Sequence, residues 1–463
     1  MTEDDRKLYI VLISVHGLIR GHNLELGRDA DTGGQIKYVL ELMRSLARHP
    51  AVGRVDLLTR QIRDPKVDSD YAAPLEQIAP NAFIVRLACG PRRYLRKEVL
   101  WPHLDTFADQ ALKHIRRVRR VPDVIHAHYA DAGYVGAQLS GLIEAPLIFT
   151  GHSLGHVKRE RLLEKGLRPE TIEGQYHLSQ RIEAEDIALD NAAFVVASTQ
   201  QEVEVQYSPY DNYRPERMVV IPPGIDLERF HPPAPGAYHP PIQHQVERFL
   251  SDTSKPMILA LARPDPRKNL AGLVRAYAET PGLREIANLV LIAGTREDVL
   301  VMEKGPRRVL SEIMFLIDRY DLYGHIAYPK QHRPEDVPEL YRWTAKSHGI
   351  FVNPALTEPF GLTLLEAAAS GLPIVATRDG GPRDIVKYCR NGLLVDPLDT
   401  ARLGEALFDA LSNRRRWRRW SQAGVAGAKR HFSWEGHVTT YLKQIGQVLD
   451  SQRAKRRFTP SLK

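Results

Sequence analysis

Two glutamates near residue 360 have the types and spacing that most clearly suggest chemistry in this chain. Glu358 and Glu366 have seven residues between them, including Gly361 and the start of an apolar helical pattern. The first carboxylate could accept hydrogen bonds from sugar hydroxyls, and the second, about two helical turns on, could hold the vicinal hydroxyls of a ribose. The backbone N–H groups of Gly361 and Leu362, at the helix start, could face a phosphate. The pattern suits a sugar nucleotide, but two solvated glutamates at a surface turn would have the same spacing.

A pair of cations follows an apolar run in the second half of the chain. Arg263 ends the run, and Lys268 comes five positions later. An arginine can bind a diphosphate through two parallel hydrogen bonds, and a lysine can bind it as a point charge. Hydrogen bonds to charged groups contribute roughly 1.5–3 kcal/mol each, so the pair could hold a nucleotide without metal. Alternatively, Lys268 and Asn269 only begin a helix.

Paired glycines precede a predicted helix near the N-terminus. Gly33, Gly34 and Gln35 lead into an apolar pattern of helical spacing over residues 36–48. Glycines at this place would let a ligand phosphate or sugar approach the backbone N–H groups. Asp31 or Thr32 could cap the same helix.

The same loop contains two aspartates that match a metal motif of another class of sugar transferase. Asp29 and Asp31 flank Ala30 in this motif. They lie in a glycine loop, and no further cluster of carboxylates is near them in the sequence. We therefore predict that the chemistry needs no metal and no other cofactor.

A histidine and several cations follow other apolar runs of the first half. His152 lies at the end of such a run, flanked by glycines, and could touch a substrate hydroxyl, although a lone histidine is more often structural. Lys158 follows it, and Arg181 lies on a predicted helix. These two cations could bind one phosphate only if the fold brings them together. Residues 92–97 hold four cations in six positions, which could bind an anionic substrate or form a solvated loop.

Short apolar runs position all of these residues. Their length suits parallel strands covered on both faces, and the helical patterns between them favour right-handed βαβ units. We therefore predict an α/β chain with two doubly wound, Rossmann-like sheets in series, whose ligands bind at the carboxyl ends of the strands. The predicted strands are 8–14, 56–60, 83–87, 124–128, 147–152, 194–198, 218–222, 257–263, 289–294, 326–328, 350–354, 374–377 and 393–396.

A proline-rich segment, 231–241, divides the two predicted domains. Its five prolines and one glycine fit a linker better than a helix or strand. We place an N-terminal domain at residues 1–235 and a C-terminal domain at residues 236–434, facing each other across a cleft. Residues 435–463 would form a helix, to about Leu449, that packs back on the first domain, followed by a basic tail.

Composition excludes several classes of protein. The chain has 463 residues, of which 43% are hydrophobic, as expected of a globular protein with two or three domains. No apolar run is long enough to span a membrane, and the charged N-terminus does not resemble a signal peptide. The two cysteines are far apart and give no disulfide framework or zinc pattern. A cytoplasmic location is the expectation.

The net charge of +8 is concentrated near the C-terminus, in residues 414–420 and 455–457. Such a surface could attract nucleic acid, anionic lipid or phosphorylated metabolites. The favoured interpretation of the first run is the solvated face of a helix, with Trp417 and Trp420 turned inward. We therefore predict no nucleic-acid partner.

Five segments together resemble the retaining glycosyltransferases of the GT-B fold, and more narrowly the sucrose-phosphate synthases. The run GRDADTGGQ (27–35) is similar to the N-terminal signature of these synthases, with Ala30 where serine is common. Residues 336–342 and 353–382 look like their donor domain. The five segments are HG (16–17), DTGGQ (31–35), GHSLG (151–155), Arg263 with Lys268, and EPFGL (358–362) with Glu366.

The resemblance implies a reaction and its donor-side residues. Glucose would pass from a nucleoside diphosphate glucose, with UDP-glucose favoured, to fructose 6-phosphate, giving sucrose 6-phosphate with retention at the anomeric carbon. Glu358 would hold the glucose, Glu366 the ribose, and Arg263 with Lys268 the diphosphate. Further donor contacts would come from Gly34, Phe360, Gly361 and Leu362.

The resemblance also implies acceptor-side and catalytic residues. Gly33, Gly34 and Gln35 would line the acceptor side. Lys97, Lys158 and Arg181 would bind the acceptor phosphate, and Arg96 could serve in place of Lys97. His152 would contact the transferred glucose. The catalytic residues would be His152, Arg263, Lys268 and Glu358.

Fixed cations would supply most of the catalysis in this scheme. The transition state places negative charge on the departing phosphate, which preorganised cations in a dry cleft stabilise. A phosphate oxygen of the leaving group could take the acceptor proton on the same face, which would retain the configuration without a covalent intermediate. Closure of the two domains would exclude water from the donor.

Several alternatives remain open at this level. Sucrose synthase uses free fructose, which does not need cations such as Lys158 and Arg181. A transferase of mannose or another hexose is a second alternative within the class. A nicotinamide-dependent oxidoreductase lacks support, because no G-x-G-x-x-G follows the first strand. No aspartate-rich phosphatase motif follows the last helix, so we expect a separate sucrose-phosphate phosphatase to act downstream.

Overall fold

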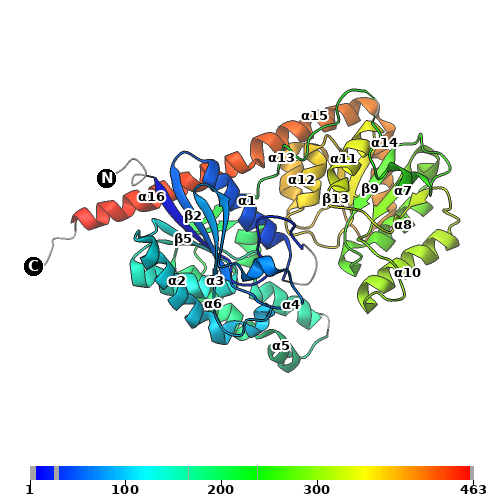
Figure 1. Cartoon of the computed structure of the whole chain (residues 1–463). Helices are drawn as coiled ribbons and strands as arrows, with labels where there is room; N and C mark the ends of the chain where they lie inside the picture. The colour runs from blue at the N-terminus through cyan, green and yellow to red at the C-terminus, as the bar shows by residue number, and fades with distance from the viewer. Residues whose placement is uncertain (1–6, 26–30, 165, 237, 459–463) are drawn as a thin grey trace, which may run out of the picture. The chain divides into compact units, whose positions relative to one another are not determined.

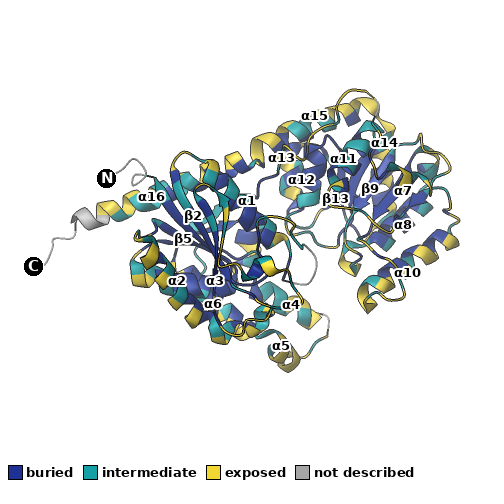
Figure 2. Cartoon of the chain, in the orientation of Figure 1, coloured by how far each residue is buried: buried dark blue, intermediate teal, exposed yellow. Residues whose placement is uncertain are grey.

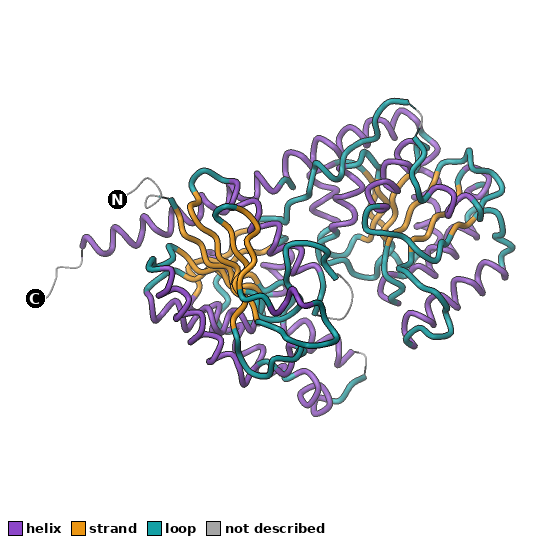
Figure 3. The backbone as a smooth tube through the Cα atoms, in the orientation of Figure 1, coloured by secondary structure: helices purple, strands orange, loops and turns teal. Residues whose placement is uncertain are grey.

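The computed structural model describes residues 7–25, 31–164, 166–236 and 238–458, which form two compact units. The first unit comprises the described residues up to Pro223 together with those from His437 onward, and the second comprises Gly224–Gly436. Each unit is an α/β layer structure in which strands gather between helices (Figure 1 and Figure 3). The predicted fold class of two Rossmann-like sheets is therefore confirmed.

The sheet of the first unit has eight strands in the order β3-β4-β2-β1-β5-β6-β7-β8. All neighbouring pairs are parallel except β3 and β4, which are antiparallel. The strands are β1 (Leu8–Ile13), β2 (Val52–Arg60), β3 (Leu75–Ala79), β4 (Ala82–Leu87), β5 (Val124–His128), β6 (Leu147–Thr150), β7 (Ala192–Ala197) and β8 (Met218–Val220). The α-helices are α1 (Gly34–Arg48), α2 (Leu104–Val118), α3 (Ala130–Ile143), α4 (Gly155–Glu164), α5 (Pro169–Tyr176), α6 (Leu178–Asn191) and α16 (Trp434–Phe458), which begins in the second unit.

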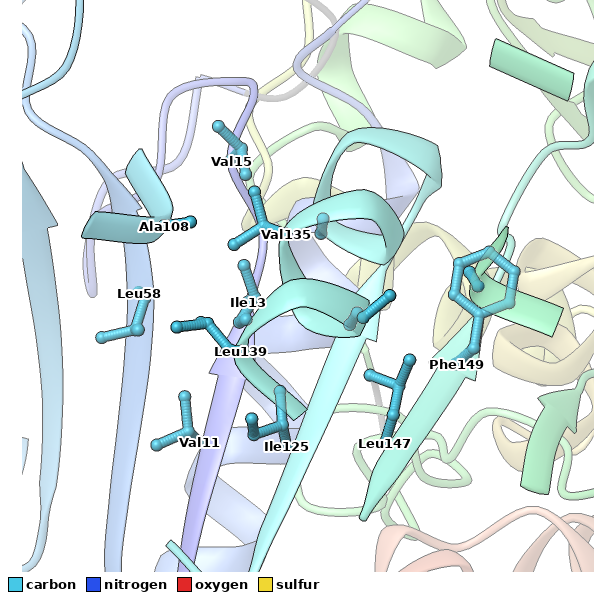
Figure 4. Packing of buried hydrophobic residues seen from close by; sticks show 14 of the residues in the cluster. Val11, Ile13, Val15, Leu58, Ala108, Ile125, Val135, Leu139, Leu147 and Phe149 are labelled. Carbon is cyan, nitrogen blue, oxygen red and sulfur yellow. The ribbon is translucent and has the colours of Figure 1, made fainter. Parts of the chain in front are cut away.

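Alternation along the strands gives the first sheet two different faces. Val11, Ile125 and Leu147 point to one face, where they pack with Val135 and Leu139 of α3 (Figure 4). Burying an aliphatic side chain of this size contributes about 1.5–3 kcal/mol. On the opposite face, β5 presents two histidines toward α1 and α16, so this side of the core is partly polar.

The sheet of the second unit has six parallel strands in the order β11-β10-β9-β12-β13-β14. They are β9 (Met257–Leu261), β10 (Asn288–Ile292), β11 (Ile326–Ala327), β12 (Ile350–Asn353), β13 (Ile374–Thr377) and β14 (Gly392–Val395). The helices are α7 (Gln243–Glu247), α8 (Leu270–Glu279), α9 (Leu283–Ile286), α10 (Lys304–Arg319), α11 (Asp336–Lys346), α12 (Leu362–Ala369), α13 (Pro382–Cys389), α14 (Thr400–Ser412) and α15 (Arg414–His431).

The strands of the second unit are buried on both faces. One cluster contains Leu291 with Leu273 and Ile313, from α8 and α10, and the other contains Phe351 with Leu364 of α12. In Figure 2 the strands are dark blue, and exposed residues lie on outward faces of helices such as α10 and α15. Continuous apolar strand sequences follow from this double coverage.

Every strand predicted from the sequence is present, with ends that differ by a few residues. Strand β3 was not predicted, because its sequence, LEQIA, lies at a sheet edge where its residues are exposed or half-buried. The helix predicted to end near Leu449 continues to Phe458 as α16. That part of the prediction was wrong because nothing in residues 450–458 stops a helix.

The two units divide between Pro223 and Gly224, whereas the proline-rich segment predicts a boundary between residues 235 and 236. The backbone N–H of Ile225 donates to the carbonyl of Phe432, and Phe230 is buried in the core of the second unit. Residues 224–230 therefore pack with the second unit. At the other end, Tyr441 of α16 hydrogen-bonds to His126 within the first unit.

The basic run at residues 414–420 forms the start of α15, as predicted. Trp417 and Trp420 are buried, and the indole N–H of Trp417 donates to the carbonyl of Gly349 at 2.8 Å. Arg414 and Arg418 are exposed. None of the helices in the described segments combines the length and the apolar character that a membrane span requires.

Candidate active site

Polar side chains of the first unit gather where three neighbouring strands end. His16 follows β1, Tyr129 and Asp131 follow β5, and His152 follows β6. These strands are adjacent in the order β1-β5-β6. Ligands of doubly wound sheets bind at this edge, so these residues define the candidate site of the first unit.

Three cations that lie far apart in the sequence line one small pocket beside this edge. The Nζ atom of Lys158 lies 4.1 Å from the centre of the Tyr176 ring, and the guanidinium of Arg181 lies 4.4 Å from the centre of the Tyr129 ring. The fold therefore brings together the residues predicted for a phosphate. The pocket, which we call the cation pocket, is lined by Lys97, Glu98, Trp101, Tyr129, Asp131, Lys158, Tyr176 and Arg181.

Carboxylates hold each cation of the cation pocket. Glu98 Oε1 lies 3.6 Å from both Lys97 Nζ and Lys158 Nζ. Arg181 Nε donates to Glu185 at 3.0 Å, and Lys97 also forms an ion pair with Asp31. Arg96 is exposed and does not line the pocket, so the geometry favours Lys97 over its neighbour.

Their surroundings shift the pKa values of Lys158 in the pocket and of Asp31 beside it. Burial and the nearby charge of Arg181 lower the pKa of Lys158 to about 8, against the opposing effect of Glu98. Burial opposes ionisation of Asp31, but the charge and hydrogen bonds of Lys97 outweigh it and lower the pKa of that carboxyl. The pocket thus holds one lysine whose charge is sensitive to mildly alkaline pH.

The glycines at the start of α1 lie in the open. Gly33 is the N-cap residue, and a Cβ added at Gly33 or Gly34 would meet no atom within 4 Å. The side-chain amide of Gln35 donates to Ser14 Oγ at 3.1 Å and to the carbonyl of His128 at 3.3 Å. Asp31 accepts a hydrogen bond from the backbone N–H of Lys97 at 2.9 Å. This loop is therefore tied to the cation pocket through Asp31.

Two imidazoles of this edge are held by other side chains. His16 Nδ1 lies 2.8 Å from Asp131 Oδ2, and both residues are buried. His152 Nε2 lies 3.0 Å from His128 Nδ1. Burial, with a smaller contribution from His16, lowers the pKa of His152 to about 3, so its imidazole is neutral near pH 7.

In the second unit, Glu358 lies between two donors. Lys268 Nζ donates to Glu358 Oε2 at 2.7 Å, and Asn353 Nδ2 donates to the same oxygen at 3.0 Å. Asn353 ends β12 and Lys268 lies in the turn after β9, so neighbouring strands bring the pair together. The loop of Glu358 packs closely on Gly380, where a Cβ would lie 2.1 Å from the Glu358 carbonyl oxygen.

Helix α12 carries the second glutamate. Glu366 is buried, and the hydroxyl of Tyr341 donates to its Oε2 at 3.3 Å. Gly361 is the N-cap residue, with φ of +94°, a conformation that a side chain would strain. As at any helix start, the first N–H groups, including that of Leu362, lack intrahelical acceptors and can face an anion.

Comparisons with known proteins agree with the two-sheet fold. Residues 6–237 match the model for the sucrose synthase first GT-B domain, and residues 242–426 match the model for glycosyl transferases group 1. The chain is 46% identical to a probable sucrose-phosphate synthase of Oryza sativa, over 96% of this chain and 52% of that protein. It is likewise 46% identical to the sucrose-phosphate synthase of Zea mays, over 95% of this chain and 47% of that protein.

The chain belongs to the sucrose-phosphate synthase family of GT-B glycosyltransferases. It spans about half the length of the curated relatives that it matches. Among solved structures, the sucrose-phosphate synthase of Thermosynechococcus elongatus has a TM-score of 0.71 and 27% identity, with 96% of this chain and 100% of that chain covered. A UDP-bound HepE of Anabaena, at 18% identity over 96% of this chain and 100% of that chain, shares the fold with a TM-score of 0.63.

Two donor-side residues predicted for this family differ in their surroundings. Arg263 is exposed, and its guanidinium makes no ion pair with any residue that the structure describes. Phe360 is half-buried and lies 6.4 Å, between ring centres, from Phe432. Arg263 is therefore available to an anionic ligand, whereas Lys268 already contacts Glu358.

The metal motif considered in the sequence lies mostly outside the described residues, which exclude Asp29 and Ala30. Within the described part of the chain, no group of three or more histidine, cysteine or carboxylate side chains is placed to hold a metal.

Several residues of the two sites were not predicted from the sequence. Asn353 and Tyr341 hold the two glutamates, and Glu98 joins the two lysines. Asn353 could have been found, because it is the polar residue that ends an apolar strand. Tyr341 and Glu98 carry no such signal, since only the fold shows what they touch.

Proposed function

We propose that this chain transfers glucose from a nucleoside diphosphate glucose, with UDP-glucose favoured, to fructose 6-phosphate. The product would be sucrose 6-phosphate, with the anomeric configuration of the glucose retained. The observation that carries the proposal is the cation pocket, in which Lys97, Lys158 and Arg181 converge. A pocket of this kind suits a phosphorylated acceptor, and the names of the closely similar relatives point the same way.

On the acceptor side, the phosphate would bind among the three cations. It would compete with Glu98 for the lysines, since Glu98 lies 3.6 Å from both of them. The sugar ring would lie against the open backbone of Gly33 and the side chain of Gln35. Each hydrogen bond between a cation and the phosphate would contribute roughly 1.5–3 kcal/mol, less the cost of displacing the carboxylate.

On the donor side, the roles fall on the loops after β9 and β12. Glu366 would accept hydrogen bonds from the ribose hydroxyls and Glu358 from the glucose hydroxyls. Arg263 and Lys268 would bind the diphosphate, and the N–H groups of Gly361 and Leu362 at the start of α12 would add to the same charge. The remaining donor contacts of the proposal are Gly34 and Phe360.

The chemistry would rest on fixed positive charge at the leaving group. As the bond from the glucose C1 to the phosphate oxygen breaks, negative charge develops on the nucleoside diphosphate, and Lys268 stabilises it. The acceptor hydroxyl attacks C1 from the face that the diphosphate leaves and passes its proton to a phosphate oxygen. The neutral imidazole of His152 would position the glucose. No metal is assigned a role in this scheme.

A neutral acceptor is the principal alternative, as in sucrose synthase. Free fructose carries no anionic group for Lys158 or Arg181 to bind. With such an acceptor, the two cations would contribute nothing to its binding. A mannosyl or other hexosyl donor is the second alternative, because the hydroxyl contacts of Glu358 depend on the sugar. The experiment must therefore vary the donor and the acceptor independently.

The test is a matrix of purified protein with UDP-, ADP- and GDP-glucose and GDP-mannose against fructose and fructose 6-phosphate, with and without EDTA. We expect a disaccharide phosphate only with a glucose donor and fructose 6-phosphate, and carbon-13 NMR should show the α-configuration at the glucose C1. Equal rates with free fructose, or an inverted product, would refute the proposal. A Lys158→Met variant should lose the preference for the phosphorylated acceptor, whereas Arg159→Met, which changes the next residue outside the pocket, should retain it.

A further inference from the structure

Two histidines, His128 at the end of β5 and His152 just after β6, lie in contact. His128 is fully buried, and its Nδ1 lies 3.0 Å from Nε2 of His152. The other ring nitrogen of His128, Nε2, is buried without a hydrogen-bond partner among the described residues. The two rings are stacked, with centres 5.2 Å apart.

This arrangement selects one tautomer for each ring. In the contact between the two nitrogens, one must donate a proton and the other must accept it. If His152 donated, the proton of His128 would sit on Nε2, where a buried N–H would have no acceptor. Orphaned buried N–H groups are rarer in proteins than orphaned buried acceptors. His128 therefore carries its proton on Nδ1 and donates a hydrogen bond to Nε2 of His152.

The tautomer of His152 follows from that of its partner. Its Nε2 accepts the hydrogen bond, and burial keeps the ring neutral, so its single proton lies on Nδ1. This Nδ1 has no hydrogen-bond partner in the described part of the chain, and His152 is only half-buried. The ring thus has one nitrogen fixed by the protein and one N–H available to a ligand.

Packing and backbone conformation hold the ring of His152 in place. The Tyr38 ring meets it edge-on, with centres 5.1 Å apart. The backbone of His152 has φ of +57°, which is uncommon for a residue other than glycine and is strained. Such strain is typical of residues whose position matters for function.

We propose that His128 is a positioning residue, which fixes His152 as the Nδ1–H tautomer so that His152 donates a hydrogen bond to an oxygen of the bound sugar nucleotide. His128 itself does not touch the ligand. The inference about the ligand rests on the function proposed above, whereas the inference about the tautomer does not. A donor of fixed direction pays no reorganisation cost when the substrate binds.

The first test reads the tautomer directly in the protein without substrates. In protein labelled with nitrogen-15 histidine, long-range proton–nitrogen correlation spectra distinguish Nδ1–H from Nε2–H rings, and the His152→Gln variant assigns the signal. We expect His152 as Nδ1–H in the natural chain and in His128→Asn, whose side-chain amide keeps a donor near the Nδ1 position. We expect the Nε2–H form, or an imidazolium, in His128→Asp, because a carboxylate only accepts. An Nε2–H ring in the natural chain would overturn the proposal.

The second test separates a positioning role from a structural one. Replacing His128 by Leu or Asp should lower kcat by roughly 10–100-fold with little change in the KM of fructose 6-phosphate, and His128→Asn should recover most of the rate. The matched control is His126→Asn, on the same strand, because His126 hydrogen-bonds to Thr150 and Tyr441 rather than to His152. Its ring also packs on that of His128, with centres 4.0 Å apart, so the control reports what a packing defect beside His128 does to the rate. The control should lose stability but keep kcat within about twofold.

The outcomes also separate this inference from the function on which it partly rests. If no donor and acceptor support turnover, the proposed function fails, yet the spectra still report the tautomer. If turnover occurs and His128→Leu is as active as the natural chain, the positioning role fails while the function stands. If the His128→Leu variant does not fold, the His128→Asn and His128→Asp variants decide the question. Their spectra and their rates should differ as described above.

Discussion

The cation pocket of the first unit and the diphosphate residues of the second unit differ in how their charges are balanced. In the first unit, Lys97, Lys158 and Arg181 each lie within 4 Å of a carboxylate. In the second, Lys268 contacts Glu358, whereas Arg263 is exposed and forms no ion pair with the described residues. The cations of the first site are thus all held by carboxylates, whereas the second site has one cation, Arg263, that is not held in an ion pair by the described residues.

This difference suggests different energetic roles. Cations already paired with carboxylates gain less from a phosphate, so they favour recognition of the acceptor over tight binding. A cation at the diphosphate meets a negative charge that grows as the leaving group departs, so it favours the transition state over the ground state. Substitutions in the two sites should therefore separate into effects on KM and effects on kcat.

The largest effect is expected from Lys268→Ala. Loss of a fixed positive charge at the leaving group should lower kcat by roughly 10²–10³-fold, since the lost interaction strengthens in the transition state. Initial rates of nucleoside diphosphate release measure it. Arg267→Ala is the matched control, because this neighbouring arginine is exposed and pairs with Asp265. Near-normal turnover of Lys268→Ala would contradict the assigned role.

The next effect concerns the acceptor. Lys158→Met should raise the KM of fructose 6-phosphate by roughly 10–100-fold, the loss of one charged hydrogen bond, and leave the KM of the donor unchanged. Arg159→Met should change neither value, since Arg159 does not line the cation pocket. If Lys158→Met raised the KM of the donor as much as that of fructose 6-phosphate, the assignment of Lys158 to the acceptor alone would be wrong.

A pH dependence should follow from the same lysine. Lys158 is cationic below its pKa of about 8, so it loses charge as the pH rises through that value. The KM of fructose 6-phosphate should therefore be lowest near pH 7 and rise by up to about tenfold per pH unit above 8. The Lys158→Arg variant stays charged throughout and should flatten the profile between pH 7 and 9.5. An unchanged slope in this variant would assign the titration to another group.

The smallest effect is expected at the N-cap of α12. Gly361→Ala forces a side chain into a positive φ and places its Cβ 2.9 Å from Leu364 Cδ1. The stability of the protein should fall by about 1–2 kcal/mol, and the donor KM should rise a few-fold because the N–H groups of the helix start shift. Thermal unfolding measures the stability, and initial rates at varied donor concentration measure the KM. Gly305→Ala, where an added Cβ meets no atom within 4 Å, is the control and should not lower stability.

Much of the donor side could be predicted, because its residues follow strands that are apolar throughout. The run Ile350–Asn353 is a strand covered on both faces, so the sequence alone places Glu358 in the loop after its end. Glu366 then follows from helical geometry alone. The partners of these glutamates, Lys268 and Tyr341, come from other elements, and sequence could only name the first as a candidate.

The acceptor side depended much more on the fold. Lys97, Lys158 and Arg181 lie in three separate segments, and no local pattern shows that they share a pocket. The exposed edge strand β3 was not predicted, since its sequence lacks the apolar pattern of its neighbours. Nothing in the sequence indicated the His128–His152 contact either, because that contact depends on the face of β5 that His128 occupies and on the register between β5 and β6.

By itself, the sequence determined the α/β layers and the chemical types at the strand ends, because apolar periodicity and glycine turns are local properties of the chain. Its motifs also resembled those of the sucrose-phosphate synthases closely enough to indicate the family. Only the tertiary structure decided which charges neutralise one another and which ring nitrogens of His128 and His152 face each other. Those properties depend on distances of a few ångströms between residues far apart in sequence, and packing alone sets such distances.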